Sequence, residues 1–349
     1  MLMNEKKERW IYPDFCKGIL IILVVVGHSI QFGLGKQYYN SGLYFANNIY
    51  KAIYSFHMPA FMIISGFFWQ NKIKSASKSS VLVSRIKKLL QPIFSWSIIV
   101  TANIFLFESM SAEKMIKTFT INFVYGLWFM WALIICSILL FTVEKIPCNK
   151  IVFVGFLMLL FLLTPDIMNF HLYKFVFPFF IMGGCIATEI KTVLKHCSDK
   201  KTLQIMPILF VVWILLLGKY SNQCYIYISG VSLLQKTNAL NQIFVDIYRW
   251  GVALIACIFA GNACYWILKI KNKAIKKIVF IVSYIGKKSM AVYIVSTTIF
   301  NKFVLPKLAW NVNAAIAVIL ESIMVLVVSL LLEIVTRKSK VLSKILWGS

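Results

Sequence analysis

Charged residues are scarce in this chain of 349 residues, and acidic residues are the scarcest of them. Only 14% of the residues are charged, with 12 Asp and Glu against 37 Lys and Arg, while 60% are hydrophobic. A water-soluble globular protein needs more polar surface than this, so that class is excluded. No linker rich in proline, glycine or serine divides the chain, and this predicts one domain over residues 1–349.

Paired cysteines are also missing. The eight cysteines include no Cys-x-x-Cys pair, and most of them fall within apolar runs. This pattern supports neither a structural zinc site nor a disulfide framework, and we expect no metal ion.

Long apolar runs, in contrast, occur along the whole chain. A transmembrane helix needs about 20 apolar residues. The runs cover roughly residues 16–34, 46–70, 91–108, 124–143, 151–165, 172–190, 205–218, 248–268, 286–305 and 313–335, of which the fifth and seventh are short. They predict an all-α fold, a polytopic integral membrane bundle of about ten transmembrane helices. No small-residue cleavage site follows the first run, so we expect a retained span and not a signal peptide.

The basic residues are distributed unevenly between the connections. If the N-terminus is cytoplasmic, most of the 37 basic residues fall on the inner side. The positive-inside rule then predicts a multi-pass protein of the inner (plasma) membrane with both short tails in the cytoplasm. The net charge of +25 therefore requires no nucleic-acid partner, and the inner face suits membrane lipid or a phosphorylated cofactor. The sequence leaves the oligomeric state open.

Three connecting segments have a recognisable character. Residues 81–92 predict a short amphipathic helix at the membrane interface before Pro92 opens the third span. Residues 275–285 predict a similar helix. The outward connection 219–248 is rich in Asn, Gln, Ser and Tyr, so it either binds a polar ligand or serves as a solvated connector.

Two histidines lie within the first two apolar runs, in Gly27-His28 and in Phe56-His57-Met58-Pro59. An ionisable group at this depth indicates a functional site, because it needs a partner or a hydrated cavity. Packing against a backbone carbonyl is the alternative. On the expected topology both histidines lie in the outer half of the membrane, where they can meet. Ser65 and Gly66, further along the second span, are small residues that permit a close helix approach.

Few charged side chains are available to act with these histidines. Lys17 shares a helical face with His28 but lies roughly 16 Å away along the axis, and Asp14 is farther still. This excludes a dyad of His28 with Asp14 on one straight helix. Glu321 is the acid well inside a span, so it is our candidate for a buried partner, with a purely structural carboxyl as the alternative. Asp246 and Arg249 are expected to pair with each other.

Several short motifs follow one another in a characteristic order from about residue 9 to residue 335. They are Arg9 with Asp14-x-x-Lys17-Gly18, Gly27-His28, Phe56-His57-Met58-Pro59, Ser65-Gly66-Phe67, Arg85-x-x-Lys88-Leu-Leu-x-Pro92, Leu127-Trp128-Phe129, Phe177-Pro178-Phe179-Phe180-x-x-Gly183 and Ile285-Gly286-Lys287-Lys288-Ser289-x-x-x-Tyr293. In order and spacing they resemble the acyltransferase-3 family of integral membrane O-acyltransferases, nearest to its branch of fucose acetylases and surface-polysaccharide O-acetyltransferases.

The resemblance implies a ten-helix core that takes an acyl group from a cytoplasmic donor, usually acetyl-CoA, and places it on a sugar hydroxyl of a surface glycan or its lipid-linked precursor. It implies that His28 is catalytic. Lys17 stands where the family often has arginine, and Arg85-x-x-Lys88 stands for an Arg-x-x-Arg pattern linked to donor binding. Both changes keep the charge but lose the bidentate fork of arginine. The family often has a histidine three residues after Tyr293; this chain has Ser296, and no role transfers to it.

Together these observations predict the roles of the candidate residues. His28 is the general base, and His57 or Glu321 orients it or stabilises the tetrahedral intermediate. The phosphates of acetyl-CoA contact Arg85, Lys87, Lys88 and Lys17 on the inner face, and Asp14 completes the predicted cofactor-binding residues. A membrane transporter or lipid-linked glycan flippase that uses the intramembrane histidines and Glu321 is the alternative. A non-catalytic scaffold is a third hypothesis, and it predicts that His28 tolerates substitution.

Overall fold

The computed structural model describes residues 10–75, 79–107, 111–146, 149–234, 238–308 and 311–348. These residues form helices and no strands, which confirms the all-α prediction. The long helices are α1 (Ile11–His28), α3 (Asn48–Ser75), α4 (Ser79–Phe107), α6 (Trp128–Lys145), α8 (Phe170–Thr188), α10 (Lys200–Gly218), α12 (Ala239–Lys269), α13 (Lys273–Lys287) and α15 (Ala314–Thr336). Shorter α-helices are α2 (Lys36–Asn40), α5 (Ala112–Ile121), α7 (Lys150–Leu163), α9 (Ile190–Ser198), α11 (Ile226–Ser229), α14 (Ser289–Val295) and α16 (Lys340–Trp347).

Other helical types fill several connections. Short 3₁₀ turns are η2 (Leu43–Ala46), η4 (Asn222–Cys224) and η6 (Leu305–Lys307). Three segments are π-helical, namely η1 (Ser29–Gly33), η3 (Asn122–Gly126) and η5 (Ser296–Val304). Because π-helical turns are rare and occur often at functional sites, these three segments direct attention to the part of the bundle where they lie.

The membrane bundle predicted from the apolar runs is confirmed. Within the described residues, eight helices are long and apolar enough to cross a membrane, and the pair α13 and α14, bent by 63°, makes a ninth if it acts as one broken span. The fifth predicted run corresponds to α7, whose 14 residues are fewer than the roughly 20 that a perpendicular crossing needs.

Two predicted boundaries were wrong. Residues 81–92 are not a separate interfacial helix, because α4 continues through Pro92. A proline inside a membrane helix is tolerated where neighbouring groups satisfy the freed backbone. Helix α12 begins at Ala239 and not near residue 248, since the polar side chains of its first turns, Gln242 and Asp246, bond to each other inside the protein. The helix predicted at 275–285 is present as α13.

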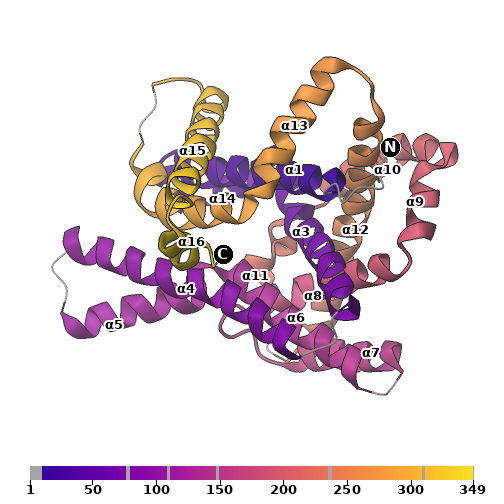
Figure 1. Cartoon of the computed structure of the whole chain (residues 1–349), viewed down its shortest axis with the longest axis horizontal. Helices are drawn as coiled ribbons and strands as arrows, with labels where there is room; N and C mark the ends of the chain where they lie inside the picture. Colours follow the sequence, from indigo (N-terminus) through magenta and orange to yellow (C-terminus); the bar gives the residue numbers. More distant parts are fainter. Residues whose placement is uncertain are drawn as a thin grey trace.

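Helix α1 runs through the middle of the molecule, where it packs against α3, α12, α13, α14 and α15 (Figure 1). Two glycines allow the neighbouring pair α3 and α8 to pack backbone to backbone. A Cβ atom on Gly66 would collide with the carbonyl oxygen of Phe180, and one on Gly183 would collide with that of Ile63. The close approach predicted for Gly66 is therefore confirmed, and it fixes the helix that carries His57.

Candidate active site

His28 is the last residue of α1, at the point where the helix continues as the π-helical η1. Its Nδ1 lies 3.3 Å from Oγ of Ser296, the first residue of η5. Oγ of Ser296 also donates to the carbonyl oxygen of Tyr293 at 3.3 Å. A hydroxyl has one proton, and Ser296 donates it to the carbonyl oxygen of Tyr293. Oγ of Ser296 therefore accepts a hydrogen bond from Nδ1–H of His28. Nε2 of His28 is then unprotonated and able to accept a proton.

Ser296 is a candidate site residue that was not predicted from the sequence. The position was recognised as one where similar proteins often have a histidine, but the serine was given no role. The available signal was its spacing of three residues from Tyr293, which places both on one helical face. The hydroxyl of Tyr293 in turn accepts from the backbone N–H of Phe129 at 3.3 Å, so two of the sequence motifs meet beside His28.

His57 is buried on α3, with 5% of its surface exposed. Its Nδ1 lies 2.7 Å from the carbonyl oxygen of Ile53, one turn earlier. A carbonyl only accepts hydrogen bonds, so Nδ1 carries the proton and Nε2 of the neutral ring has its lone pair free. The ring also packs on the edge of Tyr54, with 4.9 Å between the centroids. A Cβ atom on Gly27 would lie 2.9 Å from the ring of Tyr54, so α1 and α3 approach each other next to the two histidines.

Glu321 is fully buried on α15, as predicted, and its carboxylate lies against Gly33 at the end of η1. A Cβ atom on Gly33 would collide with that carboxylate unless the side chain of Glu321 shifted. The next residue, Ser322, donates to Oγ of Ser29 at 3.3 Å. Ser296 and not Glu321 contacts Nδ1 of His28. Glu321 is thus placed to hold the π-helical segment that follows the histidine.

We call His28, His57, Ser296 and Glu321 the histidine end of the bundle. The basic end, towards the start of α1, holds Asp14, Lys17, Arg85, Lys87 and Lys88. There Lys17 pairs with the buried Asp14 at 2.8 Å. The ammonium of Lys17 also lies 5.7 Å from the centroid of Phe68 on α3. Two of the predicted cofactor-binding residues therefore form an ion pair with each other.

The other predicted donor residues divide between two faces of α4. The guanidinium of Arg85 lies 4.7 Å from the ring centroid of Trp69. Trp69 follows Phe68, the residue that Lys17 contacts, so Arg85 and Lys17 contact the same turn of α3. Lys87 and Lys88 instead line a separate groove between α4 and α16, together with Lys344. The structure thus brings Lys17 and Arg85 to one helix turn and places Lys87 and Lys88 in another cavity.

A buried acid at the basic end was also missed. Glu333 on α15 has 1% of its side chain exposed and accepts hydrogen bonds from Lys288, at the bend between α13 and α14, and from Arg337. Arg337 lies one helical turn after Glu333, a spacing that the sequence shows, whereas Lys288 is 45 residues away and only the fold brings it to Glu333.

A second polar cluster connects the helices at the other end of α8. The predicted pair of Asp246 and Arg249 is confirmed. Asp166 accepts from Lys174 at 2.7 Å and from the backbone N–H groups of Val231 and Ser232. Burial acts to raise the pKa of Asp166, but these hydrogen bonds outweigh it, and the pKa lies below its usual value. The cluster therefore ties α8 to the connection before α12.

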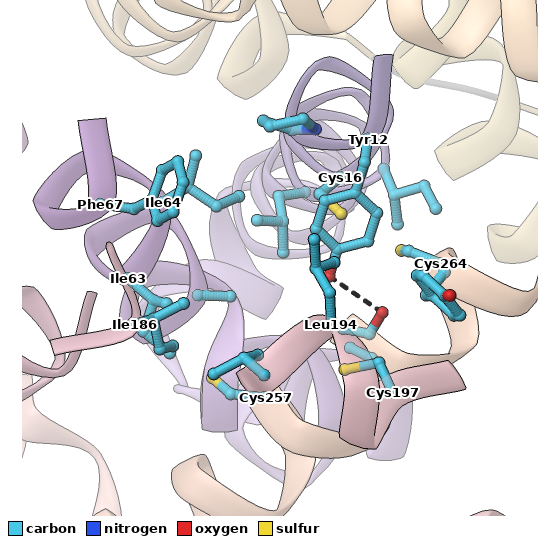
Figure 2. Close-up of a pocket in the computed structure, with 18 of the residues that line it drawn as sticks. Tyr12, Cys16, Ile63, Ile64, Phe67, Ile186, Leu194, Cys197, Cys257 and Cys264 are labelled. Carbon is cyan, nitrogen blue, oxygen red and sulfur yellow. Dashed lines mark hydrogen bonds between the residues drawn. The ribbon is translucent and has the colours of Figure 1, made fainter. Parts of the chain in front are cut away.

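A cavity of about 180 Å³ lies between α1, α3, α9 and α12 (Figure 2). It begins beside Trp10 and extends to Cys257 and to Phe56, the residue that precedes His57. Its walls are apolar, and the hydroxyl of Tyr12 is used by the carbonyl oxygen of Gly261 at 3.0 Å. Such a cavity suits a hydrocarbon chain and offers no partner for the phosphates of acetyl-CoA.

Comparison with known proteins decides the family. The profile of a family described as "Acyltransferase domain" matches residues 10–337. The chain belongs to this family. It is similar to nodulation protein NolL of Mesorhizobium japonicum, with 24% identity over 96% of this chain and 89% of the relative. NolL of Sinorhizobium fredii is 32% identical over 53% of this chain and 52% of its own length. No solved structure matches the chain.

Family membership makes the protein an acyltransferase, and its bundle of apolar helices makes it an integral membrane one. The match spans almost all of the described residues, so the histidine end and the basic end both lie within the acyltransferase domain. The roles of the individual residues are taken up below as proposals.

Proposed function

We propose that the protein transfers an acetyl group, or another acyl group, from cytoplasmic acyl-CoA to a sugar hydroxyl of a surface glycan or its lipid-linked precursor. The observation that carries the proposal is the pair of imidazoles at one end of α1, each with Nδ1 engaged by an oxygen and Nε2 left to accept a proton. Such a base, with a pKa near neutrality in its unperturbed form, is what removal of a proton from a sugar hydroxyl requires.

In the proposed reaction, Nε2 of His28 takes the proton of the acceptor hydroxyl while the oxygen of that hydroxyl attacks the thioester carbonyl carbon. The carbon–sulfur bond breaks as the tetrahedral intermediate collapses, and the departing thiolate takes the proton from the imidazolium. The products are the O-acyl sugar and free CoA. His57, on the neighbouring helix α3, is proposed to stabilise the negative charge of the intermediate or to orient His28. Direct transfer of this kind needs no acyl-enzyme, and a double displacement is the alternative.

Acyl-CoA is assigned to the basic end. Lys17 and Arg85 contact successive residues of α3, Phe68 and Trp69, and are proposed to bind the donor's phosphates. His28 is at the far end of α1, roughly 16 Å further along the axis than Lys17. The extended arm of acyl-CoA is therefore proposed to carry the acyl group along α1 to the histidines.

The decisive experiment uses the purified full-length protein in detergent. We expect release of free CoA from acetyl-CoA when a glycan fraction from the host is added, and no release with His28→Ala. In sealed inside-out vesicles, added acetyl-CoA should be consumed without permeabilisation, and in right-side-out vesicles it should not. Glycan movement without any thioester consumption would support the transporter alternative and exclude this proposal.

A further inference from the structure

A second cavity, of about 600 Å³, opens beyond His28 and differs from the apolar one in its lining. All three π-helical segments contribute to it: η1 through Phe32, η3 through Asn122 and η5 through Thr297 and Asn301. Its volume is within the usual range for small-molecule sites. Segments from three distant parts of the chain thus share both an unusual helical form and one cavity.

This cavity adjoins the proposed base directly. The ring of Phe32 contacts the ring of His28, with 6.0 Å between centroids. Thr297 follows Ser296, the hydrogen-bond partner of His28. A molecule in the cavity therefore lies next to the two residues that flank the imidazole.

The lining offers hydrogen bonds that the protein itself does not use. Oγ1 of Thr297 and Oδ1 of Asn301 are buried and have no partner among the described residues. Buried polar groups are normally satisfied, so two unsatisfied ones in one cavity indicate a ligand or water that pairs with them. A sugar hydroxyl both donates and accepts, and it suits both atoms. The rings of Tyr39 and Tyr125, also in the lining, provide faces for a sugar ring.

Charge narrows the class of ligand further. Lys36 and Lys302 both line the cavity, and none of its described lining residues is acidic. The ammonium of Lys302 donates to Oδ1 of Asn122, which positions it and leaves further N–H groups to donate. Two cations with no acid beside them attract and hold an anionic group.

We infer that this cavity is the acceptor site and that its ligand is an anionic sugar, one that carries a carboxylate or a phosphate group held by Lys36 and Lys302. The inference rests on the proposed function only in assigning the bound sugar as the acceptor of the acyl group. Binding of the sugar is measured without acyl-CoA, so a failure here and a failure of the transferase proposal give different results.

The test measures the ligand-dependent rise of the unfolding temperature of the purified full-length protein in detergent, at low salt. Glucose, glucuronate and glucose 1-phosphate are the probes. We expect at least one anionic probe to bind about ten-fold more tightly than glucose, because a charge-assisted hydrogen bond adds to the shared hydroxyl contacts. Stronger binding of glucuronate would identify a carboxylate-bearing glycan, and stronger binding of glucose 1-phosphate a phosphate-linked sugar.

Two variants and a matched control make the result specific. Lys36→Gln with Lys302→Gln should bring binding of the anionic probe down to that of glucose, while Lys114→Gln with Lys117→Gln removes the same charge from exposed positions of α5 and should change nothing. Asn301→Asp should weaken the anionic probe more than glucose. Equal binding of all three probes, or an anionic preference that survives the double cavity variant, would overturn the inference.

Discussion

At the basic end, the cations stand on regular α-helices, and each contacts an acid, an aromatic ring or an open groove. At the histidine end, α1 and α14 continue as the π-helical segments η1 and η5, and a hydrogen bond joins His28 to Ser296 across them. The first arrangement suits a site that captures a flexible, highly charged molecule. The second suits a site where a proton has to be taken at one defined atom. The difference is what a reaction with separate capture and transfer steps requires.

The sharpest way to break this comparison is His28→Ala. We expect loss of acyl transfer by several orders of magnitude with little change in thermal stability, because a general base contributes about 10² to 10⁴ in rate and positioning adds to this. Release of free CoA from acetyl-CoA measures it. Turnover near the wild-type rate would remove His28 from the mechanism and leave it as a packing residue.

His57→Ala should cause a large but incomplete loss. His57 lies beside His28 but is anchored to its own helix at Ile53, so its proposed role is to assist. We expect kcat to fall more than KM for either substrate changes, since the contribution is made in the transition state. His57→Gln, which keeps a donor for the carbonyl oxygen of Ile53, serves as the control for packing. A wild-type kcat in both variants would contradict the role.

Ser296→Ala tests how the histidine end is oriented. The hydroxyl accepts from Nδ1 of His28, and its loss frees the imidazole to adopt the other tautomer. We expect a decrease of about ten-fold in kcat, the value of one modest hydrogen bond, with KM for acetyl-CoA unchanged. Ser296→Thr keeps the hydroxyl and should retain most activity. An equal loss in both variants would point to packing and not to the hydrogen bond.

At the basic end we expect effects on KM that salt modifies. Arg85→Ala with Lys88→Ala should raise KM for acetyl-CoA at least several-fold, because a phosphate partner is lost, and added salt should increase KM further. The structure sharpens this into a comparison of the two faces of α4. If the donor lies near Lys17, Arg85→Ala alone should cause the rise in KM for acetyl-CoA. If the donor lies in the groove between α4 and α16, Lys87→Ala with Lys344→Ala should cause it. Unchanged binding in all of these variants would leave the basic residues as lipid contacts.

The smallest effect on activity is expected for Asp166→Asn, outside both ends. The lowered pKa of Asp166 means that its ionised form stabilises the folded state above the unfolded pKa of about 3.9. That contribution is lost as the pH falls through the lower, folded value. We therefore expect a lower unfolding temperature at neutral pH, a smaller difference from wild type in acid, and an unchanged KM. A change in KM would show that the cluster is coupled to the site.

Much of the site follows from local sequence. The apolar runs determined the all-α membrane bundle, because hydrocarbon leaves a continuous apolar segment little choice but a helix. Gly66 was correctly predicted at a close helix contact, because a glycine has no side chain to keep the helices apart. Asp246 and Arg249 were correctly predicted as a pair, because they lie three residues apart on one helix. The order of the motifs was enough to predict the acyltransferase family.

The tertiary structure alone decided which groups meet. Ser296 is 268 residues from His28, and no periodicity along the chain predicts their hydrogen bond. Arg85 and Lys88 look like one cluster in sequence, yet the packing of α4 on α3 and α16 separates their surroundings. Gly33, the last residue of the π-helical η1, lies against the carboxylate of Glu321, a contact between distant parts of the chain that local pattern does not predict. Local pattern therefore determines which helices form and where they cross the membrane, whereas the chemistry depends on atoms brought together from opposite ends of the chain.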